Sequence, residues 1–302
     1  MRRTLWWKHS RIIAAVLIAL LSCTGKTGPA ERLQTSFCLH SPFYFKSADP
    51  DPVLITDCNI LIYNCFGMLE ESAFVPEREM AAGAVFKTTL LAGGDYTVLV
   101  AANLGYELAA PPGLEDALQI THFLAYPDEY SHGMPMAAVK EHVPAGGTVD
   151  VRLERLMAAI YICLDKSLLD PDVQMTPVEV RIGKCPSAAR LFGPGKAERF
   201  FTNGFVRTGR ELDDLNRGGT VRLYMLENLS GENPSSYIEI KTAYHGASGH
   251  SKPGEYLVYR FFLGGEGSFD IARNTLYSIV VRPVGDGLSC EDGWRVDRGG
   301  LD

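Results

Sequence analysis

Short segments in which apolar and polar residues alternate, separated by glycine or proline, occur along most of this chain and set the narrowest limit on its fold. Residues 149–154, 178–182 and 221–226 are clear examples. A period of two residues is typical of strands with one buried face. Because such segments follow one another at short intervals, without long helical patterns between them, they favour β-sandwiches over a parallel α/β sheet.

Other segments are apolar on both faces. Residues 60–63, 96–101 and 156–164 have this composition, which predicts strands that are buried on two sides. Helical spacing is confined to residues 114–125 and to one or two turns in residues 211–216. We expect both helices to be insertions between strands.

The length of 302 residues and a hydrophobic fraction of 46% indicate a globular protein with more than one domain. No repeat of 20 to 50 residues is visible, which argues against propellers and solenoids. A Gly146-Gly147 turn precedes a new apolar run. We therefore predict an all-β protein of two tandem sandwich domains, at residues 37–150 and 151–302.

The N-terminal segment predicts the compartment. Four basic residues and no acid occur before Cys23, and residues 12–21 are apolar but too few to cross a bilayer. This predicts a signal peptide at residues 1–22. Leu20, Ser22 and Cys23 have the spacing of a bacterial lipobox, so we expect acylation of Cys23 and a flexible tether at residues 23–36. Ordinary secretion, with Cys23 as a stray thiol, is the alternative.

Composition excludes several partners and sites. After residue 22 the chain holds 36 acidic and 25 basic side chains, which argues against nucleic acid as a partner. The six other cysteines show no CxxC spacing, so we predict no metal site and no cofactor; one or two disulfides are left open, and Cys163 is expected to be a buried thiol. His122, His132 and His142 lie ten residues apart, a spacing that suits no ligand set.

A catalytic constellation is not found either. The segment around His250 and Ser251 ends in Pro253 where a nucleophile elbow needs glycine, and it lies in a glycine-rich loop. We therefore expect that the protein is not an enzyme.

Several short sequence motifs resemble, in the same order, segments of the accessory and anchor fimbrial lipoproteins of the Bacteroidales fimbrillin superfamily. Ala159 stands where that family often has lysine. The resemblance covers roughly residues 37 to 297. These motifs are residues 94–103, 134–136, 153–160, 227–231, 237–240, 259–264, 273–277 and 294–297.

The resemblance implies two transthyretin-like β-sandwich domains and a role in type V pili. It implies a lipid-anchored protein of the outer membrane and cell surface, whose partners are other fimbrial subunits; a host or bacterial surface receptor is left open. Subunits of this kind join when a strand of one fills a groove of another.

Stalk subunits of that family are cut after an arginine or lysine, so that an N-terminal strand leaves. Lys46 and Arg78 are candidate processing sites, although neither matches the family's cleavage segment. We expect loss of the first strand to open a groove beside residues 60–63. The glycine-rich chain after Arg282 is poor as a donor strand, which favours a base or tip position over the stalk.

A surface glycan-binding lipoprotein of a polysaccharide-uptake system is the alternative function. It would need a flat platform of exposed aromatic rings. Trp294 is the only tryptophan outside the signal peptide, and most tyrosines and phenylalanines lie within strand patterns.

Overall fold

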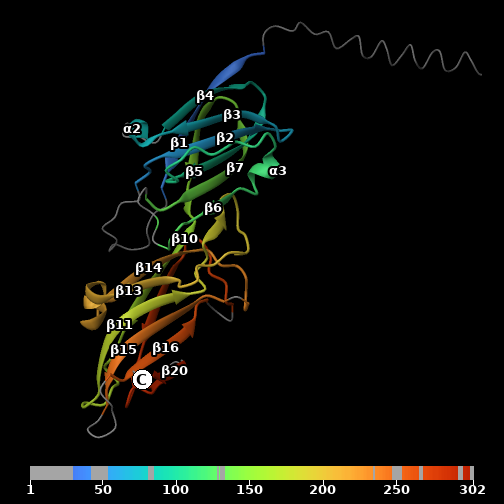
Figure 1. Ribbon diagram of the computed structural model, residues 1–302. Helices are drawn as coiled ribbons and strands as arrows, with labels where there is room; N and C mark the ends of the chain where they lie inside the picture. The colour runs from blue at the N-terminus through green and yellow to red at the C-terminus, as the bar shows by residue number, and fades with distance from the viewer. Residues whose placement is uncertain are drawn as a thin grey trace, which may run out of the picture.

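The computed structural model describes residues 30–41, 54–80, 85–127, 129, 133–233, 235–246, 254–264, 268–291 and 295–299. They form an elongated body, with the N-terminal half at one end and the C-terminal half at the other (Figure 1). The predicted all-β class is confirmed. In the described residues the helices are single short turns: α2 (Glu77–Met80), α3 (Leu114–Ala117), η1 (Gly209–Leu212) and α4 (Asp213–Asn216).

Two sheets make up the N-terminal half. The smaller has the order β4-β1-β8 and the larger the order β3-β2-β5-β7-β9. The strands are β1 (Arg32–His40), β2 (Cys58–Asn64), β3 (Leu69–Val75), β4 (Val85–Leu91), β5 (Asp95–Ala102), β7 (Met136–Pro144), β8 (Gly147–Arg152) and β9 (Glu154–Arg155).

The C-terminal half also has a three-stranded and a five-stranded sheet, in the orders β14-β10-β17 and β13-β11-β15-β16-β20. The strands are β10 (Met157–Leu164), β11 (Gln174–Gly183), β13 (Phe205–Thr208), β14 (Thr220–Leu226), β15 (Tyr237–His245), β16 (Tyr256–Phe262), β17 (Leu276–Val281) and β20 (Arg295–Gly299). Two small ribbons remain: β6 (Thr121–Phe123) with β12 (Ala188–Arg190), and β18 (Pro283–Val284) with β19 (Ser289–Cys290).

The two halves repeat one topology. In each, the first strand lies in the middle of the three-stranded sheet, antiparallel to one neighbour and parallel to the other. The second strand lies inside an antiparallel five-stranded sheet in each half. Strand β10 is thus the counterpart of β1, and β17 is the counterpart of β8. A repeat this long is invisible to a search for periods of 20 to 50 residues.

Three apolar cores hold these sheets together. One fills the space between the two sheets of the N-terminal half, and a second does the same in the C-terminal half. The third joins the halves, because Leu61 and Leu99 of the large N-terminal sheet pack in one cluster with Met157 and Leu191. This outer core explains why β2 and β5 are apolar on both faces.

One predicted helix is wrong in its extent. Of residues 114–125, only Leu114–Ala117 is helical, and Thr121–Phe123 is strand β6. Strand β6 pairs with β12, and the Leu124 amide donates to the Ser187 carbonyl at 2.9 Å. A partner more than 60 residues away therefore overrides the local helical spacing. The turns expected at residues 211–216 are confirmed as η1 and α4.

The sheets also shift two expected boundaries. Strand β1 begins at Arg32, so residues 32–36 are strand rather than part of a tether at 23–36. Strands β8 and β9 extend to Arg155 and pair within the N-terminal sheets. Arg155 is thus the last described residue paired in the N-terminal sheets, and Met157 is the first paired in the C-terminal sheets.

Candidate functional site

Strand β1 is the central strand of its sheet. It pairs with β4 from Arg32 to Cys38 and with β8 from Thr35 to His40. Side chains secure both ends: Arg32 Nη2 donates to the Thr89 carbonyl at 2.7 Å, and His40 Nε2 lies 2.8 Å from Asp150 Oδ1. Since both edges of β1 are hydrogen bonded, its removal would leave unpaired backbone groups on β4 and β8.

The inner face of β1 fills the N-terminal core. Thr35, Phe37 and Leu39 are buried, whereas the side chains between them are more accessible. The Phe37 ring stacks near Phe86 with centroids 6.3 Å apart, and the Gly146 amide donates to Thr35 Oγ1 at 2.8 Å. The slot that β1 occupies is therefore apolar, with one polar contact near its start.

The slot does not lie where the sequence suggests. We expect loss of the first strand to open a groove beside residues 60–63, but β2 pairs with β3 and β5, not with β1. Ile60 and Ile62 belong to the same core as Phe37 and therefore face β1 across the sandwich. The groove would lie between β4 and β8, because pairing is decided between distant segments.

The two candidate processing sites differ in what a cut would release. Lys46 lies outside the described residues, in the interval after β1, and a cut there would detach β1 alone. Arg78 lies in α2 with its side chain 83% exposed and its Nε 3.4 Å from Glu79 Oε1. A cut after Arg78 would also detach β3 and β2, an inner strand of the large sheet. Arg78 therefore does not fit the removal of a single strand.

The predicted membrane attachment rests on a residue that the structure does not describe. Cys23 lies outside the described residues, so its acylation stays a prediction. Among the helices in the described part of the chain, none is long and apolar enough to cross a bilayer.

The structure describes six cysteines, and none of them forms a disulfide with another described residue: Cys38, Cys58, Cys65, Cys163, Cys185 and Cys290. Cys163, expected to be buried, is half-buried on β10. Cys58 is buried in the core that also holds Phe37, and burial raises the pKa of its thiol well above the usual range. Burial likewise raises the pKa of the Cys185 thiol to about 12. Both thiols are therefore protonated at neutral pH and pack as small apolar groups.

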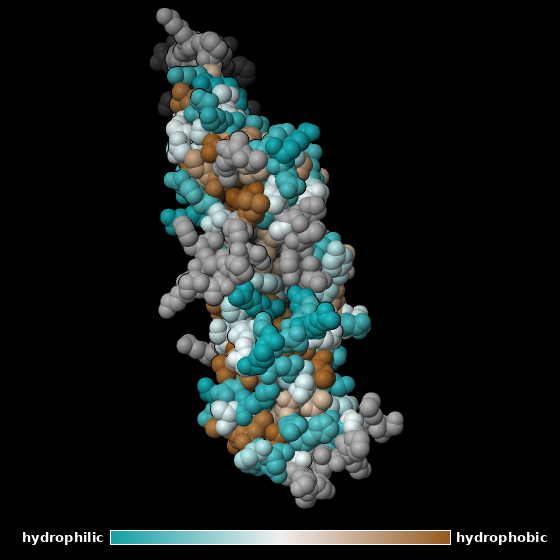
Figure 2. Space-filling model, turned by 90° about the vertical axis from the view of Figure 1, so that its left-hand side faces the viewer, coloured by the Kyte–Doolittle hydropathy of each residue, from teal (hydrophilic) through white to brown (hydrophobic). Residues whose placement is uncertain are grey.

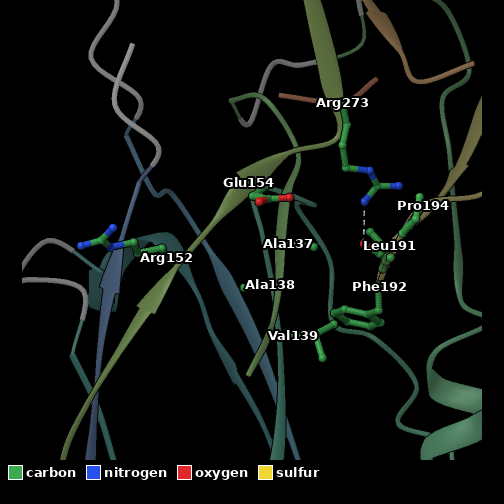
Figure 3. A pocket seen from close by; sticks show the side chains of 10 residues that line it. Ala137, Ala138, Val139, Arg152, Glu154, Leu191, Phe192, Pro194 and Arg273 are labelled. Carbon is green, nitrogen blue, oxygen red and sulfur yellow. Dashed lines mark hydrogen bonds between the residues drawn. The ribbon is translucent and has the colours of Figure 1, made fainter. Parts of the chain in front are cut away.

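A cavity of about 240 Å³ lies where the halves meet, and Figure 3 shows the side chains that line it. Strand β7 forms one wall and residues 191–194 form another. Arg273 Nη1 donates to the Leu191 carbonyl at 3.0 Å, the contact drawn as a dashed line (Figure 3). The described residues that line this cavity include two charged types, arginine and glutamate, and no histidine, cysteine or serine.

Exposed aromatic rings bear on the glycan-binding alternative. In the described part of the chain, the exposed aromatic side chains are Phe66, Tyr106, Phe123, Tyr126 and Phe262, and Trp294 lies outside the described residues. Figure 2 shows hydrophobic groups toward both ends of one face, with polar side chains between them. The view shows scattered apolar groups rather than one broad platform.

The fold defines a class of all-β proteins with a duplicated two-sheet topology, in which the first strand is central to its sheet. No protein-family model matches the sequence, and no curated protein matches it either.

Solved structures do match. A candidate cell adhesion protein from Bacteroides eggerthii has a TM-score of 0.63 at 16% identity, over 92% of this chain and 98% of that one. The fimbrilin FimA of Porphyromonas gingivalis has a TM-score of 0.57 at 14% identity, over 89% and 96%. The C-terminally truncated tip fimbrial protein Mfa3 of P. gingivalis has a TM-score of 0.53 at 14% identity, over 90% and 100%. The resemblance to the fimbrillin superfamily is thus confirmed at the level of fold.

Sequence reasoning missed the first residues of the candidate site. Residues 32–36 follow a small, polar segment, and the predicted tether at residues 23–36 includes them. The signal that identifies them is the alternation of Leu33, Thr35, Phe37 and Leu39, which has the period of a half-buried strand.

Proposed function

We propose that this protein is an accessory subunit of cell-surface fimbriae, at the base or tip, and that it joins other subunits by strand exchange. One observation carries the proposal: β1 is central to its sheet, yet it is the first strand of the described chain and is followed by the interval that holds Lys46. The shared fold with solved fimbrial and adhesion proteins supports it.

The duplicated topology supports a pair of tandem transthyretin-like sandwich domains. We place the first from the start of β1 to Arg155 and the second from Met157 to the end of β20, in place of residues 37–150 and 151–302. The third core between the halves argues that the two domains unfold together rather than independently.

Strand exchange follows from ordinary sheet pairing. A strand that replaces β1 would restore the hydrogen bonds of β4 and β8 and would insert apolar side chains at the positions of Phe37 and Leu39. Main-chain bonds would supply affinity, and the alternating pockets would supply specificity. The replacement must run antiparallel to β4 and parallel to β8, as β1 does.

The N-terminus then determines the position in the fimbrium. Retention of acylated Cys23 would hold the protein at the outer membrane, with β1 in place, as a base subunit. A cut after Lys46 would free β1, and with it the lipid, and would open the slot to a partner. The solved structures that share this fold are described by their names as adhesion or fimbrial proteins, which supports a non-enzymatic role.

The test is to purify fimbriae from the native host, measure the N-terminus and copy number of this protein by mass spectrometry, and locate it with immunogold. We expect few copies, at one end. Many copies along the shaft would exclude the terminal position, and absence from fimbriae would exclude the function.

Cys23→Ala should abolish incorporation of a labelled fatty acid. The N-terminus of Lys46→Ala, measured by mass spectrometry beside that of Arg78→Ala as the matched control, identifies any processing site.

A disulfide can test whether β1 leaves. Cys38 faces Val85 directly across β1 and β4, and opposed residues in antiparallel strands have a Cα separation of about 4.5–5.5 Å, within disulfide range. Val85→Cys should therefore lock β1 when oxidised. If the slot accepts a partner strand, the locked protein is not joined at that slot until a reductant is added, and Val85→Cys with Cys38→Ala behaves as wild type. Unchanged joining by the locked protein would exclude exchange at this slot.

A further inference from the structure

A second cavity, of about 250 Å³, lies in the N-terminal half away from the β1 slot. Its walls come from the loop after β5, from β6 and from the segment that follows β6. The residues that matter for its chemistry are Leu104, Tyr106, His122, Phe123, Leu124 and Glu129. None of these belongs to β1, β4 or β8, so this site and the strand slot are built from separate parts of the chain.

His122 is the buried polar group of this cavity. His122 is only 6% exposed, and its Nδ1 lies 3.2 Å from the Tyr106 hydroxyl. Its other ring nitrogen has no hydrogen-bond partner in the described part of the chain. Because His122 lines the cavity, this nitrogen can exchange a hydrogen bond with a molecule that enters there.

The state of His122 restricts that molecule. Burial lowers the pKa of the imidazole, while the carboxylate of Glu129 opposes the shift. The ring is therefore neutral at neutral pH, and its second nitrogen is either a donor or an acceptor, depending on the tautomer. A hydroxyl group satisfies both cases, because it can donate and accept.

Glu129 further restricts the chemistry of a molecule that could bind in this cavity. One carboxylate oxygen accepts the Ala125 amide hydrogen, and the carboxylate lies close enough to affect the pKa of His122. An ionised carboxylate only accepts hydrogen bonds and repels anions. A ligand beside it must therefore carry donors and no negative charge.

The remaining surface is aromatic and apolar. Tyr106 is 45% exposed and Phe123 is 53% exposed, and the Arg199 guanidinium covers one face of Phe123 at 5.2 Å from the centroid. Leu104 and Leu124 belong to the core between the halves and give the cavity a fixed apolar floor. Half-exposed aromatic rings beside a few convergent polar groups are typical of small-molecule sites.

We propose that this cavity binds one neutral sugar unit, the terminal residue of a surface glycan. A pyranose offers hydroxyls for His122 and Glu129 and an apolar C–H face for Tyr106 and Phe123. The volume lies just below the range of about 300–1,000 Å³ for drug-sized ligands, which suits a single ring. The proposal does not depend on the fimbrial role, and it makes the protein a glycan receptor in its own right.

The experiment is saturation-transfer difference NMR on the full-length chain in deuterated detergent. The probes are the methyl glycosides of glucose, galactose, mannose, fucose, N-acetylglucosamine and N-acetylgalactosamine, with sialic acid as an anionic comparison. We expect at least one neutral glycoside to receive saturation on its ring C–H protons, with a millimolar dissociation constant, and sialic acid to receive none.

Variants then locate the binding. Tyr106→Ala and Phe123→Ala should each weaken it at least tenfold, and His122→Phe should abolish it. Tyr126→Ala is the matched control, because Tyr126 is 52% exposed but does not line the cavity. Circular dichroism melts establish that each variant is folded. Lack of saturation transfer to every neutral glycoside, a preference for sialic acid, or equal binding by Tyr106→Ala and Tyr126→Ala would each overturn the proposal. Fimbrial incorporation is a separate measurement and is unaffected by this result.

Discussion

Arg273 and Glu227 form a buried ion pair at the junction of the two halves, with Arg273 Nε 2.8 Å from Glu227 Oε2. Their side chains are 11% and 2% exposed. The same guanidinium donates to the carbonyls of Arg190 and Leu191, which end and follow the strand that pairs with β6. One arginine thus links the C-terminal sheets to the segment that contacts the N-terminal half.

Arg273→Ala should therefore be strongly destabilising. It removes the cationic partner of the Glu227 carboxylate, which keeps the Gly195 amide as a donor, and it removes the Arg273 donors from two carbonyls. Removal of one partner of a buried pair costs about 3–5 kcal/mol. Urea unfolding at pH 7 measures this cost. Arg217→Ala is the control, because its pair with Asp214 is exposed at both ends and such pairs contribute about 0–1 kcal/mol. Equal losses in the two variants would contradict the assignment.

Gly204 and Gly209 allow a matched test of close packing. Both have a positive φ, of 64° and 58°, so an alanine meets similar backbone strain at each. A Cβ on Gly204 would lie 1.7 Å from the Ile182 carbonyl oxygen, whereas one on Gly209 would have no described atom within 4 Å apart from its chain neighbours and its own helix backbone. Gly209→Ala should cost about 1 kcal/mol, and Gly204→Ala should cost several times more, because β11 or β13 must move. Thermal melts compare the two; similar melting temperatures would refute the contact.

Phe37 should supply much of the energy that holds β1 in its sheet. Its side chain is fully buried, and truncation of a buried phenylalanine costs about 3–5 kcal/mol. We expect Phe37→Ala to lower the free energy of unfolding by that amount and to speed hydrogen exchange of the β1 amides. Gln34→Ala, on the exposed face of the same strand, should change either quantity little.

The pKa of His142 should lie above the ordinary value for histidine. Its ring is exposed, and the hydrogen bond from Nδ1 to Asp95, 3.0 Å long, raises its pKa. The stability it contributes is therefore present below about pH 6.5 and is lost as the pH rises through the folded pKa. An NMR titration of the ring protons measures the pKa, and Asp95→Asn should lower it. An unchanged pKa in that variant would exclude Asp95 as the cause.

His122 should behave in the opposite way. Burial lowers its pKa, so the unfolded chain binds a proton first as the pH falls below about 6.5. Stability should therefore fall from that pH down to the folded pKa, below which it no longer changes on account of this group. The same NMR titration resolves both histidines. A His122 resonance that shifts at or above pH 6.5 would contradict the burial argument.

Much of the strand content follows from local pattern. The alternation in residues 178–182 and 221–226 identifies β11 and β14, and the two-sided apolar run at residues 156–164 identifies β10. Side-chain alternation records how each strand is buried, and that information lies within a few consecutive residues. The segments that resemble fimbrial lipoproteins are also short stretches of consecutive residues, so they can be recognised from the sequence alone.

The cavity beside His122 could not be predicted in this way. Tyr106, His122 and Glu129 lie on loops and on a three-residue strand whose partner, β12, belongs to the other half. The helical spacing of residues 114–125 points to a different conformation for that stretch. Convergence of these side chains requires the β6–β12 pairing, which local spacing does not contain.

The sequence by itself determined that this chain is all-β and where most of its longer strands lie, and it predicts a signal peptide with a lipobox at Cys23. Only the tertiary structure decided that β1 lies between β4 and β8, that the halves repeat one topology, and that a polar, aromatic cavity forms near their junction. The physical reason is that burial of a strand is encoded by its own residues, whereas its neighbours in a sheet are chosen by hydrogen bonds and packing between segments that are far apart in the chain.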